Sequence, residues 1–249
     1  MIKDITIGQY YQAESIIHRL DPRVKLMGTL VFIISLFLGM NIWIYAFVTV
    51  ALAAVIAISK IPLKFMVRGL KSIVILIIIS AVFNLFLTPG ETLIQIWKLT
   101  ITYEGLKTAI FMVVRLVYLI LGTSLMTLTT TPNNLTDGLE KGLGFLKYIK
   151  VPVHEIAMMM SIALRFIPIL VEETDKIMKA QMARGADFEN GNIIKRAKAM
   201  VPILVPLFVS AFRRANELAM AMEARCYHGS EGRTKMKPLK YAKRDKIAY

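Results

Sequence analysis

The chain has 249 residues, of which 56% are hydrophobic, and its mean hydropathy of +0.57 is far above that of a soluble domain. The composition therefore indicates an all-α polytopic membrane protein, and the single cysteine, Cys226, excludes an intrachain disulfide. The net charge is +14, and 20 of the 31 Lys and Arg residues follow residue 129. Such a region suits anionic lipid or acidic partner grooves, whereas the lack of an accompanying groove-reading motif argues against nucleic acid.

The first hydrophobic region, Val24–Ser59, is too long for one crossing. At about 1.5 Å per residue, a single helix of this length would greatly exceed the roughly 30 Å of the hydrocarbon core. The sequence Gly39-Met40-Asn41 offers a break, and Trp43 and Tyr45 after it are typical of a membrane interface. We expect a hairpin of two short spans.

Two more spans are predicted downstream. Leu70–Leu87 forms a third span that stops at Thr88-Pro89-Gly90, and Ala109–Leu128 forms a fourth that stops at the polar run Thr129–Pro132. Residues 1–128 are thus expected to form a transmembrane region of about four spans, joined by loops.

The charges of the loops predict the orientation. The basic residues of the second loop are Lys60, Lys64, Arg68 and Lys71, and those of the third are Lys98 and Lys107. The excess in the second loop places that loop and the N-terminus in the cytoplasm. After four crossings, the chain at Thr129 is again cytoplasmic.

Residues 129–232 contain the two Ala-Arg motifs and differ in pattern from the transmembrane region. Residues 233–249 are basic and form either a tail or the start of a last span. A short amphipathic helix is expected over Pro132–Leu146, because leucines recur there at helical spacing. Thr131 would cap this helix through its hydroxyl, and Pro132 suits its first turn.

Two long segments of similar layout follow. Val153–Val171 is apolar and then charged up to Arg184, and Ala199–Phe212 is apolar and then charged up to Arg225. The prolines in the apolar parts are candidate hinges: Pro168, Pro202 and Pro206. The segments are either interfacial or re-entrant helices that bend at proline, which the repeated layout favours, or two further spans.

Both segments end in the pattern A-x-x-A-R, and the two copies are 41 residues apart. Helical spacing places Ile177, Ala180 and Arg184 on one face of the first segment, and Leu218, Ala221 and Arg225 on the matching face of the second. A small alanine below the arginine would let each tip enter a narrow groove, where the guanidinium could bind a carboxylate or backbone carbonyls. Alternatively, the arginine only stabilises the helix end; the repetition favours docking.

Several motifs occur in an order typical of one family. They are His18–Lys25, Thr129–Pro132, Leu164–Pro168 leading to Glu172-Glu173, and the two Ala-Arg motifs. As an ordered set over nearly the whole chain, they resemble the transmembrane T component of energy-coupling factor (ECF) transporters.

The resemblance implies a non-catalytic, multi-pass scaffold in a prokaryotic cell membrane, with a cytoplasmic N-terminus and two crossed, cytoplasmic coupling helices. Its partners would be two ATP-binding-cassette ATPases, identical or different, a membrane-embedded substrate-binding S component, and the lipid bilayer. The transporter would take up vitamins or transition-metal ions. No cofactor and no metal site are expected in this chain, because the ATPases bind the ATP.

In the family, each coupling helix ends in an Ala-Arg-Gly motif that docks in a groove of one ATPase. The matching residues are Ala183, Arg184 and Gly185 in the first motif, and Ala224, Arg225 and Cys226 in the second. Cysteine is small enough for a groove but lacks the preference of glycine for the left-handed cap. Family members usually continue into a final hydrophobic span, which this sequence does not reach.

Two other functions compete with this interpretation. A self-sufficient small-solute permease or channel would need an intramembrane polar pathway, for which the sequence offers Arg115 and a few Asn, Ser and Thr residues. A membrane-embedded enzyme would need paired carboxylates or histidines near a span end, and none is evident. The phosphate-binding pattern G-x-x-x-x-G-K-[ST] is also absent from the sequence.

Three further features allow two interpretations each. Arg115 in the fourth span either belongs to an ion pathway or, as we favour, lies shallow or bonds backbone carbonyls of a neighbouring helix. The run Met158–Met160 is either an adaptable surface for exchangeable S components or core packing. Glu172-Glu173 and Arg213-Arg214 lie at similar heights in the two long segments, so opposite charges would face each other if the helices cross.

Overall fold

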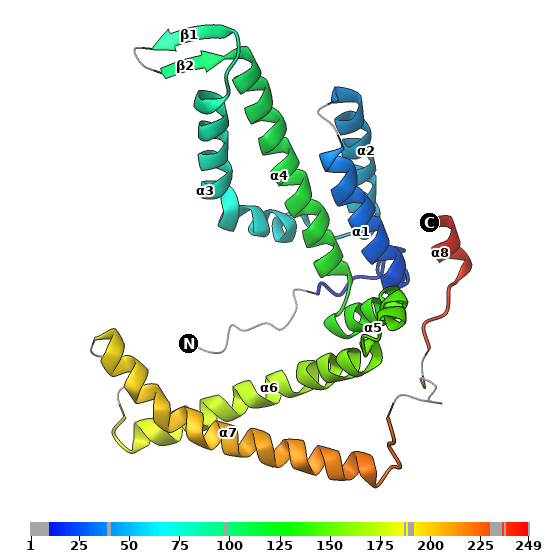
Figure 1. The fold of residues 1–249 in the computed structure, drawn as a ribbon, viewed down its shortest axis with the longest axis vertical. Coiled ribbons are helices and arrows are strands. Elements are labelled where there is room, and N and C mark those ends of the chain that lie inside the picture. The colour runs from blue at the N-terminus through cyan, green and yellow to red at the C-terminus, as the bar shows by residue number, and fades with distance from the viewer. Residues whose placement is uncertain are drawn as a thin grey trace. The chain divides into compact units, whose positions relative to one another are not determined.

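The computed structural model describes residues 10–38, 41–96, 99–186, 188, 192–229, 236 and 238–248. Within these residues, the protein is an all-α membrane protein apart from one small β-hairpin (Figure 1). Three described helices are long and apolar enough to cross a membrane, and a bent fourth qualifies if its two arms are taken together. The described residues form two compact units: one contains 10–142 and 239–248, and the other contains those between 143 and 238.

The first unit begins with the predicted helical hairpin. Helix α1 spans Pro22–Phe37 and helix α2 spans Ile42–Ser59. The Asn41 side chain caps α2 by accepting a hydrogen bond from the backbone N–H of Trp43, 3.2 Å away. Of the expected break, Gly39 and Met40 lie outside the described residues.

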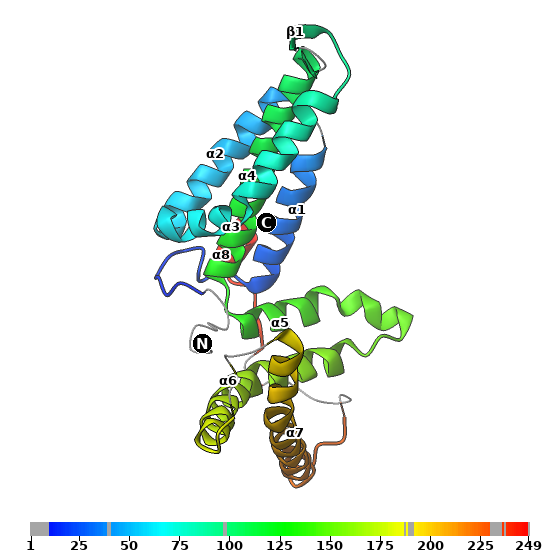
Figure 2. The ribbon, with the colours of Figure 1, turned by 90° about the vertical axis from the view of Figure 1, so that its left-hand side faces the viewer.

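Helices α3 and α4 form the second pair of this unit (Figure 2). Helix α3 (Leu63–Leu87) is bent by 60° between the arms Leu63–Lys71 and Ile73–Leu87. Three of the basic residues that were assigned to the second loop, Lys64, Arg68 and Lys71, therefore lie in the short first arm of a helix. Only the second arm corresponds to the predicted third span. Helix α4 (Tyr103–Thr129) is a candidate span that corresponds to the predicted fourth one, and it begins six residues earlier than expected.

The connection between α3 and α4 was expected to be a loop, but the described residues form a hairpin. Strands β1 (Thr92–Ile96) and β2 (Leu99–Thr102) pair antiparallel, with a register irregularity between Thr92 and Ile94. The β-branched residues of both strands explain this, because they fit an extended, paired backbone. Thr102 then caps α4 by accepting the backbone N–H of Gly105 at 3.0 Å.

Helix α5 (Pro132–Gly142) begins where the sequence predicts, because Thr131 accepts the backbone N–H of Asn134 at 3.3 Å. It ends earlier than expected, and a 3-10 helix over Gly144–Ile149 replaces its last turn. Helix α5 packs against α1 at Gly138, where an added Cβ would lie 2.9 Å from a side-chain atom of Pro22.

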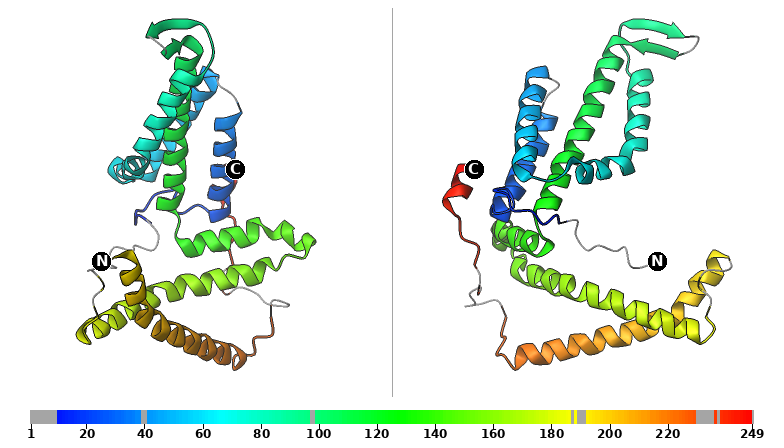
Figure 3. Two further views of the ribbon diagram at one scale, coloured as in Figure 1. Left: turned by 60° about the vertical axis from the view of Figure 1, so that its left-hand side comes forward. Right: turned by 180° about the vertical axis from the view of Figure 1, so that it is seen from behind.

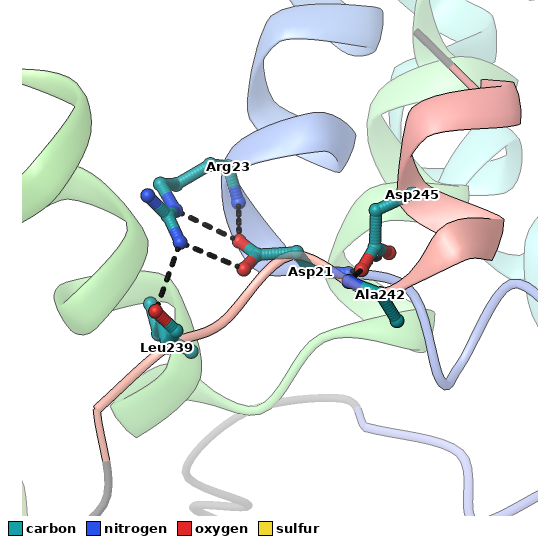
Figure 4. A network of polar contacts seen from close by, with 5 residues as sticks. All are labelled: Asp21, Arg23, Leu239, Ala242 and Asp245. Carbon is teal, nitrogen blue, oxygen red and sulfur yellow. Dashed lines mark hydrogen bonds and ion pairs between the residues drawn. The ribbon is translucent and has the colours of Figure 1, made fainter.

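The C-terminal segment returns to the start of α1 (Figure 4). Helix α8 (Lys243–Ala248) carries Asp245, whose side chain is buried and accepts two backbone N–H groups, from Asp21 at 2.9 Å and from Ala242 at 2.7 Å. Arg23 adds a hydrogen bond to the carbonyl of Leu239. The beginning of α1 and the end of the chain are thereby joined.

Asp21 is the charged centre of this junction. It caps α1 through the backbone N–H of Arg23 and forms an ion pair with the Arg23 guanidinium at 3.0 Å. Burial opposes ionisation of Asp21, but the hydrogen bonds from Arg23 and the charges of Arg23 and Lys141 outweigh it and lower the pKa of this carboxyl. Asp21 is therefore a carboxylate at neutral pH.

The second unit contains the two longest helices. Helix α6 spans Val153–Ala183 and helix α7 spans Ile193–Glu223, and they pack against each other (Figure 3). Both helices continue through their prolines, so neither breaks into an apolar and a charged piece. By length and hydropathy, α6 qualifies as a candidate span.

We predict that Asp245→Ala lowers the free energy of unfolding by about 1–3 kcal/mol, because it leaves buried backbone N–H groups without an acceptor. The measurement is thermal unfolding of the detergent-solubilised protein. Glu14→Ala is the control, since Glu14 forms an exposed ion pair with Arg19 and its loss changes little. Equal effects of the two substitutions would contradict the structural role of Asp245.

Candidate functional site

The tip of α6 is closed by a hydrogen-bonded cap. The backbone N–H of Gly185 donates to the carbonyl of Met182 at 3.0 Å, and that of Ala186 donates to the carbonyl of Gln181 at 3.0 Å. This pair of bonds is a Schellman motif, which requires a left-handed residue after the helix. Gly185 supplies it with a φ of 90°. Arg184 is thus the last residue before the chain turns away.

The tip of α7 has the same cap. The backbone N–H of Cys226 donates to the carbonyl of Glu223 at 2.8 Å, and that of Tyr227 donates to the carbonyl of Met222 at 3.0 Å. Cys226 takes the left-handed position with a φ of 58°. The substitution of cysteine for glycine therefore leaves the cap in place, at the cost of a conformation that side chains disfavour.

The two Ala-Arg motifs therefore have equivalent conformations, and both are open to their surroundings. The exposed residues at the tips are Ala183, Arg184 and Gly185 on α6, and Ala224, Arg225 and Cys226 on α7. One turn lower, Ala180 and Ala221 are also exposed, whereas Ile177 and Leu218 are half-buried. Each tip thus presents an arginine over a small, accessible alanine surface.

A polar contact joins the two helices where they cross. The Glu173 carboxylate on α6 accepts a hydrogen bond from the Ser210 hydroxyl at 2.6 Å and two from the Arg214 guanidinium at 2.6 and 3.2 Å. Ser210 and Arg214 are four residues apart and lie on one face of α7. The predicted facing of opposite charges is confirmed for Glu173 and Arg214. The sequence analysis missed Ser210, although its position one turn before Arg214 was a usable signal.

The contact joins equivalent positions of the repeat. Glu173 and Arg214 are 41 residues apart, as are Arg184 and Arg225. Each arginine tip therefore lies 11 residues beyond the crossing, which is about 16 Å of helix. The helices run in opposite directions, since Gln181 near the end of α6 contacts Pro202 near the start of α7. The two tips consequently lie at opposite ends of the pair.

Gln181 also has a role at a proline. Pro206 has no N–H group, so it cannot bond the carbonyl of Pro202 one turn before it. The Gln181 amide donates to that carbonyl at 3.4 Å. Neither Pro202 nor Pro206 interrupts α7, and Pro168 does not interrupt α6. Their assignment as hinges stays a prediction.

A pocket of about 480 Å³ adjoins the second tip. Arg225 and Cys226 line it together with Met158 and Ile162 of α6 and with His228. In the methionine run, Met159 and Met160 are largely exposed. Part of the run therefore lies beside the tip, and part is available for contacts.

Two of the family-like motifs meet in the other unit. The Lys25 ammonium donates hydrogen bonds to the carbonyls of Thr129 at 2.8 Å and His18 at 3.2 Å. These bonds hold the start of α1 against the end of α4. The motifs His18–Lys25 and Thr129–Pro132 therefore share a structural role. In the described part of the chain, no group of His, Cys, Asp and Glu side chains is placed to hold a metal ion.

Comparisons with known proteins identify similar chains. The family model described as cobalt transport protein (CbiQ) matches residues 13–236. An energy-coupling factor transporter transmembrane protein EcfT from Clostridium kluyveri is 58% identical over 100% of this chain and 93% of its own length. EcfT proteins from Thermosediminibacter oceani and Bacillus subtilis are 56% and 49% identical, over 100% and 98% of this chain and 94% and 93% of their own lengths.

We predict that Glu173→Arg or Arg214→Glu alone loosens the helix crossing and that the double reversal restores much of it. The partial exposure of this pair limits the loss in each single variant to about 1 kcal/mol. The measurement is thermal unfolding, with disulfide cross-linking between cysteines introduced in α6 and α7. The same reversals at Glu172 and Arg213 serve as the control, and an equal pattern there would refute the specific contact.

We further predict opposite effects of exchanging the two cap residues. Cys226→Gly should stabilise the tip of α7 by about 0.5–1 kcal/mol because it removes the left-handed strain, and Gly185→Cys should destabilise the tip of α6 by a similar amount. Amide hydrogen exchange at the two caps measures both changes. Slower exchange at the tip of α6 in Gly185→Cys would contradict the prediction, because it would mean that a side chain at the left-handed position does not destabilise the cap.

Proposed function

This chain belongs to the family of energy-coupling factor transporter transmembrane proteins, and we propose that it connects two ATP-binding-cassette ATPases to a membrane-embedded substrate-binding subunit. Arg184 and Arg225 would each dock in a groove of one ATPase. The observation that carries the proposal is the equal length of the two arms beyond the Glu173–Arg214 crossing. Two equal arms with identically capped ends suit two ATPases related by symmetry.

The chemistry of the tips supports docking. Arginine presents a rigid fork of N–H donors to carboxylates or backbone carbonyls, and the neighbouring alanines add no bulk that would block a groove. The two tips share their backbone hydrogen bonds, so both could enter the same type of groove. They differ in Gly185 and Cys226, which also permits two different ATPases.

In this mechanism, ATP binding brings the ATPases together and moves the two grooves. The charged ends of α6 and α7 would lie in the cytoplasm, as the loop charges predict, and would follow the grooves. The arms would shift about their crossing, and the apolar parts of both helices would transmit the shift to the substrate-binding subunit. That subunit would then release its vitamin or transition-metal ion inside the cell. Coupling of this kind requires two states with different contacts at the tips.

We predict that Arg184→Glu combined with Arg225→Glu abolishes co-purification with the ATPases while membrane insertion is retained. Reversed charges would repel a carboxylate groove and could not donate hydrogen bonds. Each single variant should keep one attachment and lose part of the yield. Affinity purification from native membranes, with mass spectrometry of the bound subunits, makes the measurement.

Arg213→Glu is the matched control, since it reverses the charge of an exposed arginine of α7 that lies 12 residues before Arg225, outside the tip. Co-purification of the double tip variant at the level of this control would refute docking through the arginines. The same purification identifies the substrate-binding subunit.

A further inference from the structure

Arg115 lies in the apolar helix α4 and has an unusual environment. Its Nε donates to the Tyr45 hydroxyl on α2 at 3.0 Å, and its guanidinium lies 5.1 Å from the ring centre of Phe37 on α1. The hydrogen bond is to a side chain of a neighbouring helix, whereas the sequence favoured a shallow position or bonds to backbone carbonyls. Among the described residues, Tyr45 is the one hydrogen-bond acceptor of this guanidinium. Its terminal nitrogens therefore have donors left for a ligand.

The contacts of Arg115 fix its depth. Phe37 is the last residue of α1, and Tyr45 lies three residues after the first residue of α2. Helix α2 has 18 residues, about 27 Å, and is only just long enough to cross the hydrocarbon core, so its ends mark the two interfaces. Tyr45 is about 4.5 Å inside one of them. Arg115 is therefore within about one helical turn of the interface at the α1–α2 connection, although it lies well inside α4.

The next polar pair along these helices behaves differently. Thr49 and Tyr118, one turn deeper on α2 and α4, share a hydrogen bond of 2.6 Å between their hydroxyls. The two hydroxyls satisfy each other and need no external partner. Thr49 and Tyr118 therefore form a self-contained pair deeper in the helices, whereas Arg115, nearer the interface, keeps N–H donors for an external partner.

The surroundings of Arg115 are those of a lipid contact. Phe37 is 60% exposed and lies against the guanidinium, whereas Tyr45, which accepts the hydrogen bond from Nε, is buried. A long arginine side chain at this depth can extend its charge to the headgroup level. A phosphate is the anion found there, and its geometry fits the arginine fork.

We propose that Arg115, Tyr45 and Phe37 form a binding site for the phosphate of an anionic phospholipid in the leaflet that contains the α1–α2 connection. Arg115 binds the phosphate through its terminal nitrogens, Tyr45 orients the guanidinium through Nε, and Phe37 contacts the first part of an acyl chain. The site is independent of the helix tips, so it holds whether or not the tips dock to ATPases.

The test uses a single tryptophan as a local reporter. Phe37→Trp in a Trp43→Phe, Trp97→Phe background places the only tryptophan beside Arg115, because the chain has two natural tryptophans. The protein is reconstituted into vesicles of phosphatidylcholine that contain either brominated phosphatidylglycerol or brominated phosphatidylcholine. Bromine quenches fluorescence at short range, so the ratio of quenching measures the local preference for the anionic lipid.

The expected result is a preference of at least threefold for phosphatidylglycerol, which falls to nearly one in Arg115→Gln and is largely kept in Arg115→Lys. Lys107→Gln is the control, since it removes one exposed positive charge two turns away on α4 and should keep the preference. An absent preference, or an equal loss in Lys107→Gln, overturns the proposal. An absent preference would indicate that Arg115 binds another partner, such as an acidic side chain of a second membrane subunit. An equal loss in Lys107→Gln would indicate that the preference comes from the general positive charge of the surface.

Discussion

The contact of Glu173 with Ser210 and Arg214 determines the geometry on which the proposed function rests. Three hydrogen bonds converge on one carboxylate at the crossing of two 31-residue helices. Because both partners are partly exposed, the contact adds little to stability. Its effect is on register, since it aligns equivalent positions of the repeat. A slip of either helix by one turn would make the arms unequal.

Helices α6 and α7 are continuous, but each lacks backbone hydrogen bonds at its prolines. Prolines remove backbone hydrogen bonds inside the apolar parts of α6 and α7, yet both helices run through them. At Pro202, a glutamine from the other helix occupies the carbonyl that Pro206 cannot bond. A lever needs stiffness along its length, and it can bend only where such bonds are missing. The prolines lie inside the apolar parts of both helices, so any bend there would occur before the charged ends.

Local sequence signals predicted the start of several elements because their physical causes are local. Asn41, Thr131 and Pro132 stand at helix starts as their side chains dictate. The β-hairpin before α4 was missed, because short β-branched runs in a loop stabilise each other only after they pair. The bend in α3 was also missed, although Gly69 and Ser72 stand beside it in the sequence and such residues are common at helix kinks. The left-handed Cys226 shows the limit of residue preference, because the hydrogen bonds of the cap outweigh it.

The sequence by itself determined the membrane class, the helical hairpin, the two long segments and the paired arginine ends, since composition, periodicity and repetition are properties of neighbouring residues. Only the tertiary structure decided that Glu173 selects Arg214 and Ser210, that Asp245 joins the end of the chain to α1, and that Arg115 bonds the Tyr45 hydroxyl. Each of these depends on side chains that are distant in the sequence. Their contacts arise from packing, which no local pattern records.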